Sequence, residues 1–169
     1  MSRKDAVCFT GHRSQKLPWG SNVEDPRYLK TKEMTREAIE LEIMRGKSFF
    51  ISGMALGFDT MCAEIVLSLK DKYPHIRLEC ALPCKDQEKM WDVQDRYIYH
   101  KILEQADVVS YLQADYTKYC LQKRNEYMVD KCNVVIALFG GRLGGTKNTI
   151  DYAYKKLKEV RIIPVIDKL

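Results

Sequence analysis

The sequence predicts an α/β fold, a Rossmann-like three-layer α/β/α sandwich built on a mostly parallel sheet of about six strands. The first observation is that short apolar runs alternate with longer segments of helical periodicity, as in successive βαβ units. The second is that VVIAL and RIIPVI are apolar almost throughout. Such strands are buried on both faces, whereas strands with one exposed face alternate apolar and polar residues.

The six expected strands are short runs rich in β-branched and other apolar residues. They cover residues 6–10, 48–52, 77–82, 108–112, 134–138 and 161–166. Between most of them, apolar residues recur every three or four positions, which indicates helices. The helical segments cover residues 31–45, 58–69, 87–105, 121–131 and 146–158. Gly46 follows the first helix as a stop signal, and Pro83 ends the third strand.

Length and composition predict a single soluble domain over residues 1–169. The chain is 46% hydrophobic and 30% charged, which allows both a core and a hydrated surface. No apolar run reaches the roughly 18–20 residues that span a bilayer. The N-terminal stretch MSRKDAVCFTGHR lacks the apolar region of a signal peptide. We therefore expect a cytoplasmic protein with no membrane partner.

The cysteines and the charge limit the kinds of site to expect. None of the six cysteines has a Cys-x-x-Cys or zinc-site spacing, and most lie in apolar stretches. We therefore expect buried reduced thiols and no metal. The net charge of +5 permits anionic ligands, but no single stretch carries it, so a nucleic acid partner is allowed without being favoured.

Three glycine-bearing turns follow three of the strands. They are TGHR at 10–13, SGMALGFD at 52–59 and the loop 140–146, which holds four glycines. Because the carboxyl ends of parallel strands meet at one sheet edge, the turns should emerge together, where Rossmann-like folds bind ligands. Each leads towards a helix N-terminus, whose free N–H groups attract phosphate. The turns therefore predict phosphate-binding loops; the alternative is tight turns with helix caps.

Polar side chains near this edge complete the predicted site. Arg13 and Arg124 would pair with phosphate oxygens, and Asp59 or Glu126 would hold ribose hydroxyls. Alternatively, Asp59 caps a helix, and Arg124 and Glu126 lie on a solvated helix face. The residues expected to bind the ligand are Gly11, His12, Arg13, Ser52, Gly53, Met54, Asp59, Arg124, Gly140, Gly141, Gly144, Gly145 and Thr146. No cofactor is required beyond a nucleotide ligand.

Two common nucleotide-binding motifs are excluded. The pattern G-x-G-x-x-G would need a glycine in place of Phe139. Gly140 and Gly145 have the glycine spacing of a Walker A loop, but Thr146-Lys147 reverses its Lys-Ser/Thr order. The chain is therefore predicted to be neither a P-loop NTPase nor an ordinary dehydrogenase.

Four segments together resemble the YpsA-like proteins of bacteria and their phages, members of the SLOG superfamily named for Smf/DprA and LOG proteins. They are FTGHR, ISGMALGFDTMCAE, QKRNEYMVDKCNVVIALFGG and GGTKNTIDYA. The resemblance runs from Thr10 to Ala153 with the motifs in the expected order. It implies a Rossmann-like fold and, because related proteins often assemble, a homo-oligomer.

The resemblance implies several functions. LOG enzymes are phosphoribohydrolases that cut the N-glycosidic bond of nucleoside monophosphates, DprA proteins bind single-stranded DNA, and other members are thought to sense nucleotides derived from NAD or ADP-ribose. Arg124 and the Gly-Thr pair of the last loop match the LOG motif, but Thr149 stands at the position of its glutamate. A hydroxyl is uncharged at neutral pH and cannot stabilise an oxocarbenium-like centre. Catalysis would therefore need Glu126 or Asp59 as a substitute carboxylate.

The sequence thus predicts a nucleotide-binding sensor or regulator whose ligand is an adenine nucleotide, NAD or ADP-ribose and survives unchanged. An N-glycosidase or phosphoribohydrolase that releases a free base is the alternative, and whether the protein is an enzyme stays open. Single-stranded DNA binding, as in DprA, is the second alternative. No accessory DNA-binding domain, long basic tract or run of exposed aromatic residues is expected in this chain.

Overall fold

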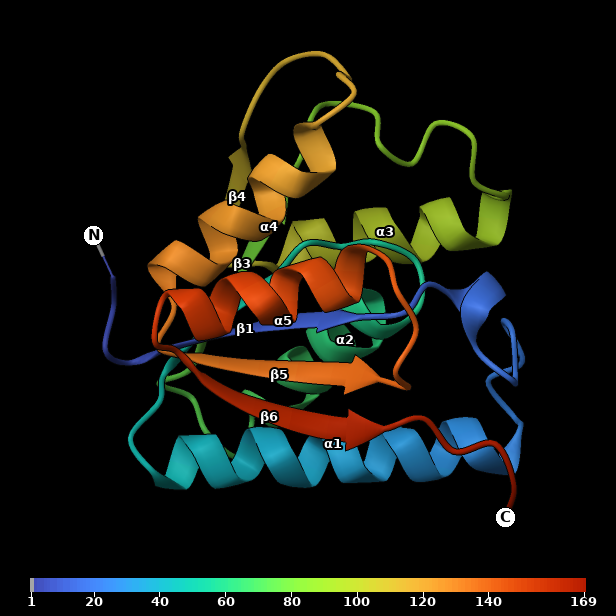
Figure 1. Cartoon of the computed structure of the whole chain (residues 1–169), viewed down its shortest axis with the longest axis horizontal. Coiled ribbons are helices and arrows are strands. Elements are labelled where there is room, and N and C mark those ends of the chain that lie inside the picture. The colour runs from blue at the N-terminus through green and yellow to red at the C-terminus, as the bar shows by residue number, and fades with distance from the viewer. Residues whose placement is uncertain (1) are drawn as a thin grey trace.

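All six strands form one parallel sheet in the computed structural model, which describes residues 2–169. The strand order is β4-β3-β2-β1-β5-β6, and every neighbouring pair is parallel (Figure 1). The strands are β1 (Ala6–Gly11), β2 (Phe49–Ser52), β3 (Arg77–Leu82), β4 (Val108–Tyr111), β5 (Val134–Phe139) and β6 (Glu159–Pro164). This sheet, with helices on both faces, confirms the predicted Rossmann-like architecture.

In the described part of the chain, five α-helices and one short 3-10 helix connect the strands. They are η1 (Ser14–Lys16), α1 (Pro26–Met44), α2 (Phe58–Leu69), α3 (Val93–Gln105), α4 (Cys120–Lys131) and α5 (Gly145–Lys155). Buried residues of α1, α2 and α3 pack in one core cluster, and buried residues of α4 and α5 pack in a second cluster on the other face of the sheet (Figure 1).

The central strands supply both core clusters in alternation. Val7 and Phe9 of β1 belong to the cluster beneath α1–α3, whereas Ala6 and Cys8 belong to the cluster beneath α4 and α5. Both sets are fully buried, which explains why the strand sequence is apolar at consecutive positions. All six cysteines are buried free thiols, as the sequence predicts.

Several predicted boundaries are wrong because capping residues, not apolar periodicity, set the helix starts. Helix α1 begins at Pro26 rather than at 31, since the Asp25 carboxylate accepts a hydrogen bond from the Arg27 backbone N–H at 2.8 Å and proline suits a first helical turn. Helix α3 begins at Val93 rather than at 87, because Asp92 caps it in the same way.

The last two elements also differ from expectation. Helix α5 ends at Lys155 rather than at 158, and Leu157 takes the left-handed conformation that stops it (φ 58°). The early end lets β6 begin at Glu159 and finish at Pro164, two residues before each predicted bound. Among residues 2–169, no helix is both long and apolar enough to span a bilayer.

The topology places a switch point between β1 and β5. The chain adds β2, β3 and β4 on one side of β1 and then returns to place β5 on its other side. Gly11 at the end of β1 is in register with Leu138 near the end of β5, so the loops after these strands leave the same edge together. This crevice is where open α/β sheets bind ligands.

A buried glutamate on β3 fixes α4 to the sheet. The Glu79 side chain is fully buried and accepts hydrogen bonds from Ser110 Oγ of β4 at 2.8 Å and from Tyr127 Oη at 2.7 Å. Its other oxygen pairs with Lys131 Nζ at 2.7 Å. Tyr127 and Lys131 both belong to α4, so the position of this helix depends on one buried charge.

Glu79→Ala is expected to lower the free energy of unfolding by about 3–5 kcal/mol, because it leaves Lys131 and two hydroxyl groups without their shared buried acceptor. Urea unfolding followed by circular dichroism measures this loss. The control is Glu33→Ala, since Glu33 pairs with Lys30 on the surface and should change stability by no more than about 0.5 kcal/mol. Equal losses in the two variants would contradict the role of Glu79.

Candidate functional site

A cavity of about 380 Å³, here the central cavity, opens at the switch point. The loop after β1 forms one wall, and the first turns of α2, α4 and α5 form the others. Its lining residues are Thr10, Gly11, His12, Arg13, Gln15, Lys16, Ala55, Asp59, Lys118, Leu121, Gln122, Arg124, Asn125, Leu143, Gly144, Gly145 and Thr146.

The N-terminus of α5 faces this cavity without a side-chain cap. Gly144 precedes the helix with a φ of 144°, and no side chain among residues 2–169 accepts a hydrogen bond from the first turn of the helix. A Cβ atom added at Gly145 would meet nothing within 4 Å, so the space beside this turn is open. Uncapped N–H groups and the positive end of the helix dipole suit an anion here.

Arg124 is the central buried charge of the site. Only 3% of its surface is exposed, and its Nη1 donates to the Gly53 carbonyl oxygen while Nε donates to Asn125 Oδ1 at 2.9 Å. A Cβ on Gly53 would lie 2.7 Å from the guanidinium, so a larger residue there would displace Arg124. Burial lowers the pKa of Arg124, and the negative charge of Asp59 opposes this shift.

Asp59 lines the cavity wall and is buried (6% exposed). Its Oδ2 accepts a hydrogen bond from the Ala55 backbone N–H at 3.2 Å. Burial raises the pKa of Asp59, while Arg124, the Ala55 hydrogen bond and Arg13 pull that pKa back down. The carboxylate therefore interacts with two cations but forms no direct ion pair with either within residues 2–169.

Three predicted contact residues instead build a support beneath the cavity. Ser52 Oγ donates to the Asp59 carbonyl oxygen at 2.8 Å and accepts from the Met54 backbone N–H at 3.2 Å. Met54 adopts a positive φ of 58° to close this turn. This buried turn therefore supports Asp59 and Arg124 from behind. Its residues Ser52, Gly53 and Met54 do not line the central cavity.

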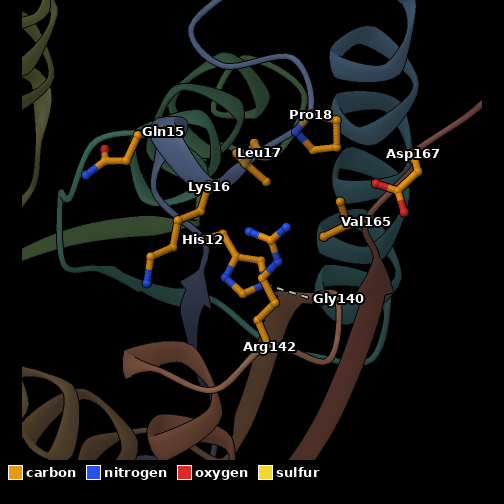
Figure 2. Close-up of a pocket in the computed structure, with 9 residues that line it drawn as sticks. All are labelled: His12, Gln15, Lys16, Leu17, Pro18, Gly140, Arg142, Val165 and Asp167. Carbon is orange, nitrogen blue, oxygen red and sulfur yellow. Dashed lines mark hydrogen bonds between the residues drawn. The ribbon is translucent and has the colours of Figure 1, made fainter.

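A second cavity of about 400 Å³, here the histidine cavity, adjoins the first (Figure 2). The two share His12, Gln15 and Lys16. Figure 2 shows the His12 ring with the Lys16 and Arg142 side chains beside it. His12 Nε2 accepts the Gly140 backbone N–H at 3.2 Å, so the neutral ring carries its proton on Nδ1. The remaining lining residues are Leu17, Pro18, Gly140, Arg142, Val165 and Asp167.

The two cavities carry cations that lack protein counter-charges. Across residues 2–169, the side chains of Arg13, Lys16, Lys118 and Arg142 form no ion pair with a carboxylate. Together with Arg124 they outnumber Asp59 and Asp167, the two carboxylates that line these cavities, so the crevice carries a net positive charge. Such a field favours an anionic ligand over a neutral or cationic one.

The other predicted site residues divide into three groups. The central cavity brings together Gly11, His12, Arg13, Asp59, Arg124, Gly144, Gly145 and Thr146. The histidine cavity adds Gly140. Glu126 and Gly141 line neither cavity; Glu126 lies further along α4 and accepts a hydrogen bond from Gln122 Nε2 at 3.2 Å.

Sequence reasoning missed Gln15, Lys16, Lys118, Gln122 and Arg142. Gln15 and Lys16 lie in η1, a short helix with no apolar periodicity to reveal it. Within residues 2–169, no group of three or more His, Cys, Asp or Glu side chains is arranged to hold a metal ion.

The titration of His12 should make stability depend on pH. Burial lowers the pKa of His12 below its ordinary 6.5, and the charges of Lys16 and Arg142 lower it further. As pH falls, His12 is therefore protonated in the unfolded chain before it is protonated in the folded protein. The contribution of neutral His12 to the free energy of unfolding is complete above about pH 7 and declines as pH falls through 6.5. His12→Gln, which keeps an acceptor for Gly140 and does not titrate, should show a shallower decline from pH 7.5 to 5.5 in urea unfolding. Parallel declines in the two proteins would contradict this assignment.

The comparisons with known sequences agree with the fold and the motifs. The family model YpsA, described as the YspA SLOG family, matches residues 7–164. The chain is 32% identical to the uncharacterized SPbeta prophage-derived protein YoqJ of Bacillus subtilis over 146 residues, which cover 79% of this chain and 85% of that protein. It is also 32% identical over 136 residues to the UPF0398 protein BH1768 of Halalkalibacterium halodurans, covering 79% and 71% of the two chains.

Two solved structures of DNA processing protein A share the fold. The protein from Streptococcus pneumoniae superposes with a TM-score of 0.65 at 16% identity, over 95% of this chain and 50% of that one. The protein from Helicobacter pylori superposes with a TM-score of 0.61 at 18% identity, over 93% and 64%. The chain thus spans about half to two thirds of these larger proteins. With a family model that matches nearly its whole length, the chain belongs to the YpsA family of SLOG proteins.

Proposed function

We propose that the protein binds the phosphate of an adenine nucleotide, NAD or ADP-ribose in the central cavity and acts as a sensor or regulator. One observation carries the proposal. The uncapped N-terminus of α5 opens into a cavity whose walls also hold buried Arg124 and unpaired Arg13. Backbone N–H groups and guanidinium groups together are the donors that phosphate oxygens require.

In this proposal Asp59 binds the ribose of the ligand. Its carboxylate lines the same cavity as Gly145 and Thr146, and one oxygen is already oriented by the Ala55 N–H. The other oxygen makes no hydrogen bond within residues 2–169, so it is available to a sugar hydroxyl.

Hydrolysis of an N-glycosidic bond is the second candidate, and Asp59 is the observation in its favour. Thr149, at the position of the LOG glutamate, is buried and donates to the Gly145 carbonyl oxygen at 2.8 Å, so it is occupied within α5. Glu126 does not line the cavity. Catalysis would therefore depend on Asp59, and release of a free base that stops in Asp59→Asn would establish it.

Single-stranded DNA binding is the third candidate because the Helicobacter pylori neighbour was studied for its mode of binding single-stranded DNA. Tyr116 and Tyr119 are 67% and 62% exposed in the loop before α4, beside the cation Lys118. Exposed aromatic rings next to cations suit unpaired bases. A short oligonucleotide therefore belongs among the ligands tested, and light scattering on the same sample tests the expected homo-oligomer.

A thermal-shift panel with AMP, ADP, NAD, ADP-ribose and a short single-stranded DNA tests the proposal. A nucleotide at about 100 times its dissociation constant should stabilise the protein by about 2.7 kcal/mol. Gly145→Asp should weaken the binding by about 10- to 100-fold, because its carboxylate occupies the phosphate position. The same aspartate favours the helix dipole, so the unliganded variant should stay folded.

Gly145→Asn is the matched control, since asparagine has the same shape without the charge. It should lose markedly less affinity than Gly145→Asp. Stabilisation by the DNA alone, or equal binding by the two variants, would contradict a phosphate site at α5.

A further inference from the structure

A third cavity, here the aromatic cavity, adjoins the central cavity and is not lined by His12. It measures about 270 Å³ and shares Arg13, Gln15, Ala55 and Leu121 with the central cavity. Its other walls come from outside the phosphate site. They are Leu56, Gln87, Trp91 and Tyr116. The cavity therefore combines two aromatic rings, aliphatic side chains, two amides and the Arg13 guanidinium. Because it shares four lining residues with the central cavity, a ligand can reach it from the proposed phosphate position.

The two aromatic rings differ in how they are held. Trp91 is half-buried and packs edge-on against buried Tyr99, with ring centroids 5.2 Å apart and planes at 86°. Tyr116 is 67% exposed at the rim. Trp91 thus gives the cavity wall a fixed ring, and Tyr116 gives the rim an accessible one.

Gln87 gives the aromatic cavity a hydrogen-bond preference. Its Nε2 donates to the carbonyl oxygens of Gly53 at 3.3 Å and Met54 at 3.4 Å. Because both partners are acceptors, the amide nitrogen must face them, which fixes the orientation of the amide. The Gln87 carbonyl oxygen accepts no hydrogen bond within residues 2–169, so the cavity wall carries a free acceptor.

We propose that the aromatic cavity binds the nucleobase of the ligand and selects a base with an exocyclic amino group. The inference rests on the proposed function, because the phosphate must occupy the central cavity for the base to enter this one. Trp91 and Tyr116 contact the base ring, and the Gln87 oxygen accepts from its amino group. Arg13, which lines both cavities, lies between base and phosphate. The same Gln87 amide holds the Gly53–Met54 turn, so base recognition is linked to the support of Arg124.

Calorimetric titration with AMP, IMP and ribose 5-phosphate tests the base site. IMP replaces the amino group by a carbonyl, and ribose 5-phosphate lacks the base. The wild-type protein should bind AMP at least about tenfold more tightly than either, since stacking and one good hydrogen bond each contribute about that factor. Tyr116→Ala should lower the affinity for AMP about tenfold and leave the affinity for ribose 5-phosphate unchanged.

Tyr97→Ala is the control, because Tyr97 is similarly exposed (57%) but lines none of the three cavities. It should change neither affinity. Gln87→Met should remove the preference for AMP over IMP. Equal affinities for AMP and ribose 5-phosphate, or unchanged AMP affinity in Tyr116→Ala, would overturn the base site while the phosphate site stands. If neither AMP nor ribose 5-phosphate binds, the proposed phosphate site fails as well.

Discussion

The contact between the Arg124 guanidinium and the backbone at Gly53 is the interaction on which the rest of the site depends. It joins α4 to the turn after β2. A buried cation is tolerated only where hydrogen bonds and a nearby opposite charge offset its lost hydration. Here the Gly53 carbonyl, Asn125 and the field of Asp59 supply these, and Glu79 anchors α4 from its other end. Displacing Arg124 would therefore disturb the cavity wall and the turn together.

Within this arrangement the protein leaves several positive groups unsatisfied. Four cations around two adjoining cavities have no carboxylate partner within residues 2–169, and the first turn of α5 has no side-chain cap. Such groups repel one another in the empty protein, so they favour the state in which an anion is bound. The aromatic cavity continues the crevice with rings and an amide acceptor. A phosphate joined to a base through a sugar matches this sequence of surfaces.

The sheet could be predicted from the sequence because apolar runs and their alternation with helices are local properties. The roles of the glycines could not be predicted in the same way. They indicate close approach, but the approaching group comes from distant segments: the Phe58 ring at Gly11, Arg124 at Gly53 and Val165 at Gly140. Gly145 in the first turn of α5 differs from these glycines, because it faces open space at the central cavity. The contributions of Lys16 and Trp91 depend on tertiary placement, which neither spacing nor composition encodes.

A crystal structure of the protein grown with ADP-ribose would show whether the N-terminus of α5 holds a phosphate. We expect phosphate oxygens within about 2.7–3.2 Å of the backbone nitrogens at Gly145 and Thr146. We also expect a contact with Arg124 or Arg13 and the adenine ring between Trp91 and Tyr116. An ordered ligand bound elsewhere on the protein, with the N-terminus of α5 free of phosphate, would contradict the proposed phosphate site.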